Sequence, residues 1–183
     1  MRAAIKGIFS TEWLSVQVRR LAASCEGASA VEFAIISPLL IALVLAILQV
    51  ALIVFATQAL ETLAAQASRQ ILTLQSQSLT QSAFQTAVCQ NIVVLFSCNN
   101  IMIDVQTYGS FSSAVTSAPT LTFDASGNVT NTWQFSPGSA GSIVVMRVMY
   151  QWPVFFGPLG LNLSNLSNGK RLLMATAAFK NEP

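Results

Sequence analysis

A glycine, a glutamate and an aromatic residue stand at fixed spacing at the start of the longest apolar run of the chain. The stretch reads G-A-S-A-V-E-F, from Gly27 to Phe33. Gly27 has no Cβ atom, so a protease can approach its backbone closely. The Glu32 carboxylate borders the apolar run, and a carboxylate in a bilayer costs about 2.5–3.5 kcal/mol at mid-membrane and less near the interface. The free N-terminus of a neighbouring subunit would neutralise this carboxylate, which would give an assembly of such chains an axial register.

Simpler interpretations of these residues stay open. Ser29-Ala30-Val31-Glu32 also matches a capping box, S-x-x-E, placed before an apolar run. A negative residue in the first turn also suits the helix dipole. Gly27 on its own is equally compatible with a flexible joint. The capping and assembly interpretations of Glu32 are compatible with each other.

Two cysteines enclose a short apolar segment. Cys89 and Cys98 flank Q-N-I-V-V-L-F-S, whereas Cys25 precedes the apolar run. In an oxidising compartment, Cys89 and Cys98 are expected to form a disulfide, which would stabilise the fold by very roughly 2–3 kcal/mol. The alternative is a pair of unpaired core cysteines.

The composition argues against an enzyme. The chain has no histidine, the commonest general base and metal ligand. The acidic residues after the apolar run are too far apart to indicate a carboxylate pair, and there is no Gly-rich phosphate loop. They are Glu61, Asp104, Asp124 and Glu182. We therefore predict no catalytic residue, metal site or cofactor, and a net charge of +2 without a basic face predicts no nucleic-acid partner.

The apolar run predicts a transmembrane helix. It extends from Phe33 to Ala56, and only Ser37 and Gln49 in it are polar. A helix of this length covers about 36 Å, which exceeds a hydrocarbon core of about 30 Å. Pro38 predicts a gentle kink near its start. A lipid bilayer is therefore an expected partner.

The run is longer than the apolar part of a cleavable secretory signal and begins further from the N-terminus. An A-x-A match at Ala65-Gln66-Ala67 nevertheless leaves one alternative open. In that alternative the chain is cut after Ala67 and its C-terminal part is a secreted soluble protein.

The flanking charges predict the orientation of the span. Four basic residues precede it, whereas Arg69 alone follows within the next 15 or so positions. The positive-inside rule then places the N-terminus in the cytoplasm and the C-terminal part outside. The preceding basic residues are Arg2, Lys6, Arg19 and Arg20.

The helix is expected to continue beyond Ala56. Apolar residues recur there at three- and four-residue spacing, which is typical of one helix face. We favour packing of this face on the protein's own domain, with packing against neighbouring subunit helices as the alternative. The Gln-, Ser- and Thr-rich residues 73–86 are interpreted as the helix end or a polar connection. The apolar face consists of Leu60, Leu63, Ala64, Ala67, Ile71 and Leu74.

The C-terminal part carries strand signals. Residues 101–108, 143–152 and 171–179 are predicted strands, with a short candidate at 121–123, a turn at 124–128 and a breaker at 136–141. An antiparallel sheet packed on the helix is the simplest arrangement of these segments. The predicted fold class is therefore α+β, with a long N-terminal helix and a small antiparallel sheet. Trp133, Tyr150 and Trp152 are expected in the core or at the membrane interface, with an exposed adhesive patch as the alternative.

The junction resembles the processing site of prepilins. The resemblance implies that a membrane-embedded prepilin peptidase cuts between Gly27 and Ala28, so that Glu32 becomes mature residue five and Phe33 its aromatic neighbour. Over residues 27–56 the chain resembles the TadE/TadG-like family of tight-adherence (Flp-type) pilus assembly proteins, and the C-terminal A-T-A-A-F-K-N-E-P is also similar to its short members. The chain departs from the family in its long leader and in having Phe33 where some members have tyrosine.

The resemblance implies a minor pilin-like (pseudopilin) subunit, whose partners are the peptidase and other pilus-assembly subunits. The expected organisation is a cytoplasmic leader at 1–27, a transmembrane helix at 28–58 and an extracytoplasmic α+β domain at 59–183, in a bacterial inner membrane or a surface pilus. A type II secretion pseudopilin is a variant of this hypothesis. The alternative function is a membrane-tethered binding or adhesion module that keeps its leader.

Overall fold

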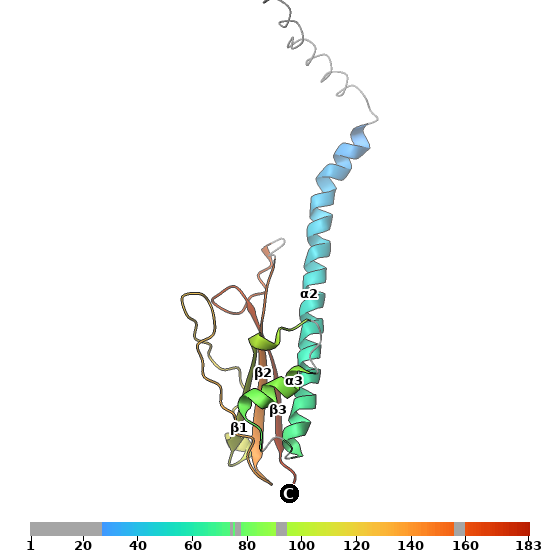
Figure 1. Ribbon diagram of the computed structural model, residues 1–183. Helices are drawn as coiled ribbons and strands as arrows, with labels where there is room; N and C mark the ends of the chain where they lie inside the picture. Colours follow the sequence, from blue (N-terminus) through green and yellow to red (C-terminus); the bar gives the residue numbers. More distant parts are fainter. Residues whose placement is uncertain (1–26, 74, 76–77, 91–94, 156–159) are drawn as a thin grey trace, which may run out of the picture. The chain divides into compact units, whose positions relative to one another are not determined.

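The computed structural model describes residues 27–73, 75, 78–90, 95–155 and 160–183. The predicted leader before Gly27, including Cys25, lies outside the described residues, as does Leu74 of the predicted helix face. The chain divides into two units, residues 1–45 and 46–183. From Ala28 onward, the described part of the first unit belongs to one helix. The second unit contains the rest of that helix, a shorter helix and a β-sheet (Figure 1).

Helix α2 extends from Ala28 to Leu72 and continues through Pro38. The predicted continuation beyond Ala56 is therefore confirmed. No other proline and no glycine interrupts its 45 residues, and both are the strongest helix breakers. The Thr57 hydroxyl donates to the Ile53 carbonyl at 2.8 Å, which satisfies this polar group within the helix itself.

A second helix, α3, extends from Gln81 to Cys89. The interpretation of residues 73–86 as the helix end or a polar connection is therefore wrong from residue 81 onward. Thr80 begins the helix, because its side-chain oxygen accepts from the backbone N–H of Ala83 at 3.3 Å. Phe84 and Val88, one turn apart, are its buried residues. Polar composition concealed a short helix that tertiary packing stabilises.

The sheet contains three antiparallel strands in the order β1-β2-β3. The strands are β1 (Ile101–Tyr108), β2 (Ile143–Trp152) and β3 (Arg171–Lys180). Ile101 pairs with Tyr150, and Trp152 pairs with Arg171. The start of β1, the end of β2 and the start of β3 therefore lie at one end of the sheet. The three main predicted strands are confirmed to within one residue.

The connection between β1 and β2 contains a short 3-10 helix, Phe111–Ser113, and a turn. The short strand candidate at 121–123 is wrong, because only an isolated bridge joins Phe123 to Val129. The predicted turn at 124–128 is confirmed. Backbone and side-chain N–H groups of Asn128 donate to the Asp124 carboxylate at 2.8 and 3.1 Å and hold the pKa of that carboxyl below its ordinary value.

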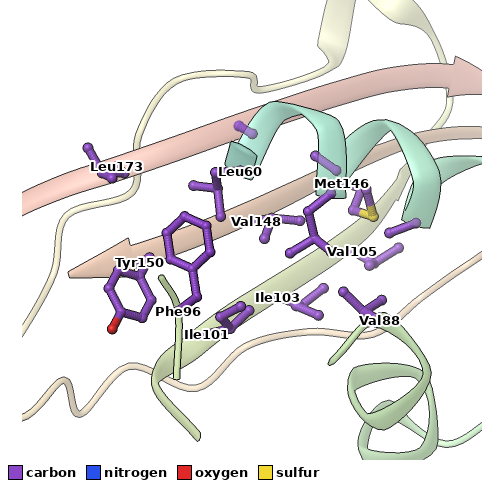
Figure 2. Packing of buried hydrophobic residues seen from close by; sticks show 14 of the residues in the cluster. Leu60, Val88, Phe96, Ile101, Ile103, Val105, Met146, Val148, Tyr150 and Leu173 are labelled. Carbon is purple, nitrogen blue, oxygen red and sulfur yellow. The ribbon is translucent and has the colours of Figure 1, made fainter. Parts of the chain in front are cut away.

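The core lies between α2, α3 and one face of the sheet. Figure 2 shows Ile101, Ile103 and Val105 in a row along β1, and Leu60 of α2 above the sheet. The predicted packing of the helix face on the protein's own domain is confirmed, since its described members belong to this cluster. These members are Leu60, Leu63, Ala64, Ala67 and Ile71. The long apolar helix and the small antiparallel sheet also confirm the predicted α+β class.

Candidate functional site: the exposed apolar helix surface and its supporting domain

Helix α2 begins one residue after the glycine of the predicted processing junction. Its first residue is Ala28. Gly27 is exposed, and a Cβ atom added to it would meet no heavy atom within 4 Å. Glu32 is exposed, and Phe33 is 69% exposed. The structure therefore leaves the backbone of Gly27 and both predicted assembly side chains accessible.

The position of the helix start bears on the alternative interpretation of Glu32. A capping box places serine at the N-cap and glutamate at the third helical residue. Ser29 is instead the second residue of α2, and the first turn contains no acidic residue. In this structure Ser29 is therefore not at the N-cap position that a capping box requires.

The first half of α2 presents large apolar side chains on all sides. A helix that is apolar all round belongs in the core of a large protein or in a membrane. Within the described chain this surface is uncovered, and its most apolar 18-residue window has a mean hydropathy of 3.1. Among the described residues, α2 alone is long and apolar enough to span a membrane. The exposed residues include Val31, Ile35, Ile36, Leu39, Leu40, Ile41, Leu43, Val44, Ile47, Leu48, Leu52, Val54 and Phe55.

The second half of α2 is covered along one stripe by the sheet domain. Within the second unit this stripe begins at Ala46, which is buried, and at Gln49, which is half-buried. It continues through the buried residues Ile53 and Ala56 to Ile71. The spacing of three and four residues keeps all these positions on one helix face. The covered stripe therefore begins inside the apolar run, about ten residues before the run ends.

This packing opposes the alternative in which the chain is cut after Ala67. Ala67 is 2% exposed and lies near the C-terminal end of α2. A cut there would remove Ile53, Leu60 and Leu63 from the core cluster that they share with the sheet. The C-terminal product would expose the apolar face of the sheet, which makes a stable soluble fragment improbable on packing grounds.

The predicted disulfide joins Cys89, at the end of α3, to Cys98, with their Cα atoms 5.6 Å apart. The Gln85 side-chain amide donates to the Cys98 carbonyl at 3.4 Å and to the Ile101 carbonyl at 3.1 Å. Phe84 contacts Phe135, with ring centroids 5.1 Å apart. The disulfide and the Gln85 amide together hold α3 against the start of β1.

We expect the double substitution Cys89→Ser/Cys98→Ser to lower the free energy of unfolding by about 2–3 kcal/mol. The disulfide joins residues nine positions apart in the sequence and restricts the unfolded chain between them. The measurement is chemical unfolding of the full chain in detergent micelles. Cys25→Ser is the matched control and should leave stability unchanged. A reducing agent should destabilise the parent chain and leave the double variant unaffected, and equal stability of parent and double variant would contradict the assignment.

The sequence interpretation missed a buried ion pair between neighbouring strands. Asp104 of β1 lies opposite Arg147 of β2, and an Arg147 Nη atom donates to the Asp104 carboxylate at 2.6 Å. Arg147 also donates to the Ser117 carbonyl at 3.2 Å, and Asp104 accepts from the Gln134 backbone N–H at 3.0 Å. Both contacts lie in the connection between β1 and β2. Through these two hydrogen bonds the ion pair holds the β1–β2 connection against the sheet, on the side opposite α2.

A signal for this pair was available in the sequence. Each of the two best predicted strands is apolar and β-branched around a single charge, Asp104 in one and Arg147 in the other. Opposite charges in neighbouring buried strands are expected to pair, because an unpaired buried charge is costly. The register that brings them together depends on the long connection between the strands, which the local pattern does not specify.

The aromatic residues gather at the end of the sheet where β2 stops. Phe96 contacts Tyr150 and Trp152, with centroid distances of 5.0 and 6.2 Å. Tyr150 and Trp152 are buried and Trp133 is half-buried. The core interpretation therefore holds for Tyr150 and Trp152. A groove of about 320 Å³ runs along α2 beside Phe96, lined by Phe55, Gln58, Ala59, Thr62, Leu63, Gln66 and Phe96.

The described residues contain no cluster of three or more His, Cys, Asp or Glu side chains that could hold a metal ion. The Asp104–Arg147 pair is buried and engaged by the surrounding connection. The candidate functional residues of the described chain are the exposed apolar side chains of α2 and the predicted junction residues at its start.

A family model described as TadE-like protein matches residues 27–69, which begin at the predicted junction glycine and end in the covered part of α2. No curated protein and no solved structure matches the chain.

Proposed function

We propose that this protein is a minor, pilin-like subunit of a tight-adherence pilus assembly system. The premise is the match of residues 27–69 to the TadE-like family model, which implies a role in tight-adherence pilus assembly. The first half of α2 holds the protein in the bacterial inner membrane as a single span. The N-terminus is cytoplasmic and the sheet domain is periplasmic. A prepilin peptidase removes the leader between Gly27 and Ala28.

The observation that carries this proposal is the uncovered apolar surface of α2. It begins within a few residues of the junction, where Val31, Phe33 and Ile35 are each more than half exposed. An apolar helix surface of this extent requires lipid or other helices as its surroundings. A single span satisfies it in the membrane, and neighbouring pilin-like helices would satisfy it in an assembly.

Glu32 and Phe33 are proposed to contact a neighbouring subunit. After cleavage, the ammonium group of Ala28 in one subunit would lie at the same membrane depth as the Glu32 carboxylate of a neighbour offset along the assembly axis. Pairing of the two charges removes the cost of a lone carboxylate at the bilayer edge. The exposed Phe33 ring beside it would pack against the apolar surface of the same neighbour.

We expect Glu32→Gln to abolish incorporation into the pilus assembly while leaving leader removal and membrane insertion intact. Truncating one partner of a desolvated charge pair costs about 2–5 kcal/mol, which corresponds to a loss of association of more than tenfold. The measurement is co-purification of the full chain with other assembly subunits, together with counts of surface pili. Glu61→Gln, at an exposed position of the same helix, is the matched control. Equal assembly by the Glu32 and Glu61 variants would contradict the role of Glu32.

A further inference from the structure

The described domain carries two exposed apolar side chains in the connection between β2 and β3. Phe155 is 68% exposed and Leu161 is 47% exposed. We call the described residues 153–155 and 160–163 the hairpin arms. The whole stretch between Arg147 and Lys170 contains no charged residue. Exposed apolar side chains in a charge-free connection are candidates for contact with a membrane or another apolar surface.

The topology determines at which end of the domain these arms lie. The backbone N–H of Glu182, just after β3, donates to the Leu72 carbonyl at the end of α2 at 3.1 Å. The start of β3, where Arg171 pairs with Trp152, therefore lies toward the other end of α2. In Figure 1 the connection between β2 and β3 extends beyond the sheet, toward the side from which α2 enters the second unit.

Strand and helix lengths give the level of this end along α2. Strand β3 has 10 residues, which span about 33 Å at ~3.3 Å per residue. The same length of helix contains about 22 residues at ~1.5 Å per residue. Counting back from Leu72 reaches the neighbourhood of Ile53, and Ile53 indeed shares a core cluster with Trp152. The hairpin arms extend beyond Trp152 and therefore lie beside the last turns of the apolar run.

This placement conflicts with a sheet domain that stays wholly outside the bilayer. Ile53 and Ala56 belong to the apolar run, yet both are covered within the second unit. Other side chains of the same turns, those of Leu52, Val54 and Phe55, are exposed. If these turns lie in the membrane, the part of the domain beside them lies at the same depth. The exposed apolar side chains of the arms, Phe155 and Leu161, then lie at the same depth as exposed apolar side chains of α2.

The residues that border the arms suit the membrane interface. Lys170 and Arg171 follow the arms, and cationic side chains there can reach anionic headgroups. The exposed apolar side chains of the arms are therefore followed by basic ones, as expected for a segment that leaves a membrane interface.

From this geometry we infer that the hairpin arms form a second membrane contact, in which Phe155 and Leu161 insert into the outer interfacial layer of a lipid bilayer beside α2. The inference rests on the proposed membrane span of α2. The contact would fix the tilt and rotation of the domain on the membrane, because two separate attachments restrain a body more than one helix does. The occupant of the apolar surface is lipid, not a second copy of the chain.

The test uses an environment-sensitive fluorophore on single cysteines in the full chain with Cys25→Ser, with the Cys89–Cys98 bridge verified by intact mass. The labelled variants are Phe155→Cys and Leu161→Cys. The matched control is Phe111→Cys, which replaces another exposed aromatic, 56% exposed, just beyond Tyr108 at the opposite end of β1. Leu48→Cys, on the exposed surface of α2, reports the span itself. The chain is reconstituted in phosphatidylethanolamine/phosphatidylglycerol vesicles that contain nitroxide lipids labelled near the headgroup or near the end of the acyl chain.

The inference predicts a blue-shifted emission for the probes at 155 and 161, loss of quenching by aqueous iodide, and stronger quenching by the shallow than by the deep nitroxide. The probe at 111 should keep its aqueous emission and iodide quenching.

Iodide quenching at 155 and 161 equal to that at 111, with the probe at 48 in lipid, would overturn the inference and leave the span intact. An aqueous probe at 48 would overturn the proposed span. Shielding of 155 and 161 from iodide and from both nitroxides would indicate a second copy as the occupant and would also overturn the inference.

Discussion

The substitution Arg147→Met is expected to lower the free energy of unfolding by about 3–5 kcal/mol, because it leaves the Asp104 carboxylate buried without its partner. Both side chains are nearly inaccessible, with 6% and 4% exposed, and they are joined at 2.6 Å. The change also leaves the Ser117 carbonyl without the guanidinium donor. The connection between β1 and β2 should loosen together with the sheet. The measurement is urea unfolding of the full chain in detergent micelles, followed by tryptophan fluorescence.

Two further variants separate the ion pair from a general effect of losing an arginine. Arg69→Met changes an exposed arginine of α2 and should shift stability by less than about 0.5 kcal/mol. Asp104→Asn/Arg147→Met removes both charges and keeps an amide oxygen that can accept from Gln134. The double variant should therefore be more stable than Arg147→Met alone. A double variant that is less stable than the single one would show that the buried carboxylate is not the source of the cost.

Phe84→Ala is expected to lower the free energy of unfolding by about 3–5 kcal/mol, the usual cost of deleting a fully buried phenylalanine. Phe84 is 0% exposed and its ring packs against Phe135. The substitution would remove the main apolar contact of α3 with the domain. It would also remove the ring contact with Phe135, whose backbone forms an isolated β-bridge with Val105 of β1. Thr86→Ala, at an exposed position of the same helix, is the control and should change stability little. Equal unfolding midpoints for the two variants would contradict this role of α3.

Segments with a strong and continuous pattern could be predicted from the sequence. The β-branched run of β2 and the alternation of β1 were sufficient to place both strands, and the apolar face from Leu60 to Ile71 was sufficient to place the helix on the domain. Helix α3 has only two buried positions, Phe84 and Val88, in a polar segment. Two apolar positions are too few to define a helical periodicity in the sequence. A short helix that depends on tertiary contacts was therefore not predicted.

Two features of the candidate site required coordinates for a different reason. The Asp104–Arg147 pair depends on the register between two strands that a long connection separates, and local patterns do not encode that register. The covered stripe on the last turns of the apolar run also depends on how far the sheet extends along α2. A hydropathy profile gives both sides of a helix the same weight, so it cannot distinguish exposed residues such as Val54 from covered ones such as Ile53.

The predicted processing junction, in contrast, depends only on the residues themselves. The spacing of Gly27, Glu32 and Phe33 can be read from the sequence without knowledge of the fold. The structure adds that α2 begins at Ala28 and that Gly27 has free space around it. An alanine at position 27 therefore fits without a clash, and any loss of cleavage in Gly27→Ala would report on the peptidase and not on misfolding.

The proposal that the chain is a processed, pilin-class subunit is tested most directly by the intact mass of the membrane-extracted protein, expressed with and without an active prepilin peptidase. The account predicts that the peptidase removes the mass of residues 1–27, leaving Ala28 as the N-terminal residue, and that Gly27→Ala retains the full mass. An uncut parent chain, in cells where the same peptidase cleaves a known substrate, would contradict the account. It would then favour a membrane-tethered binding module that keeps its leader.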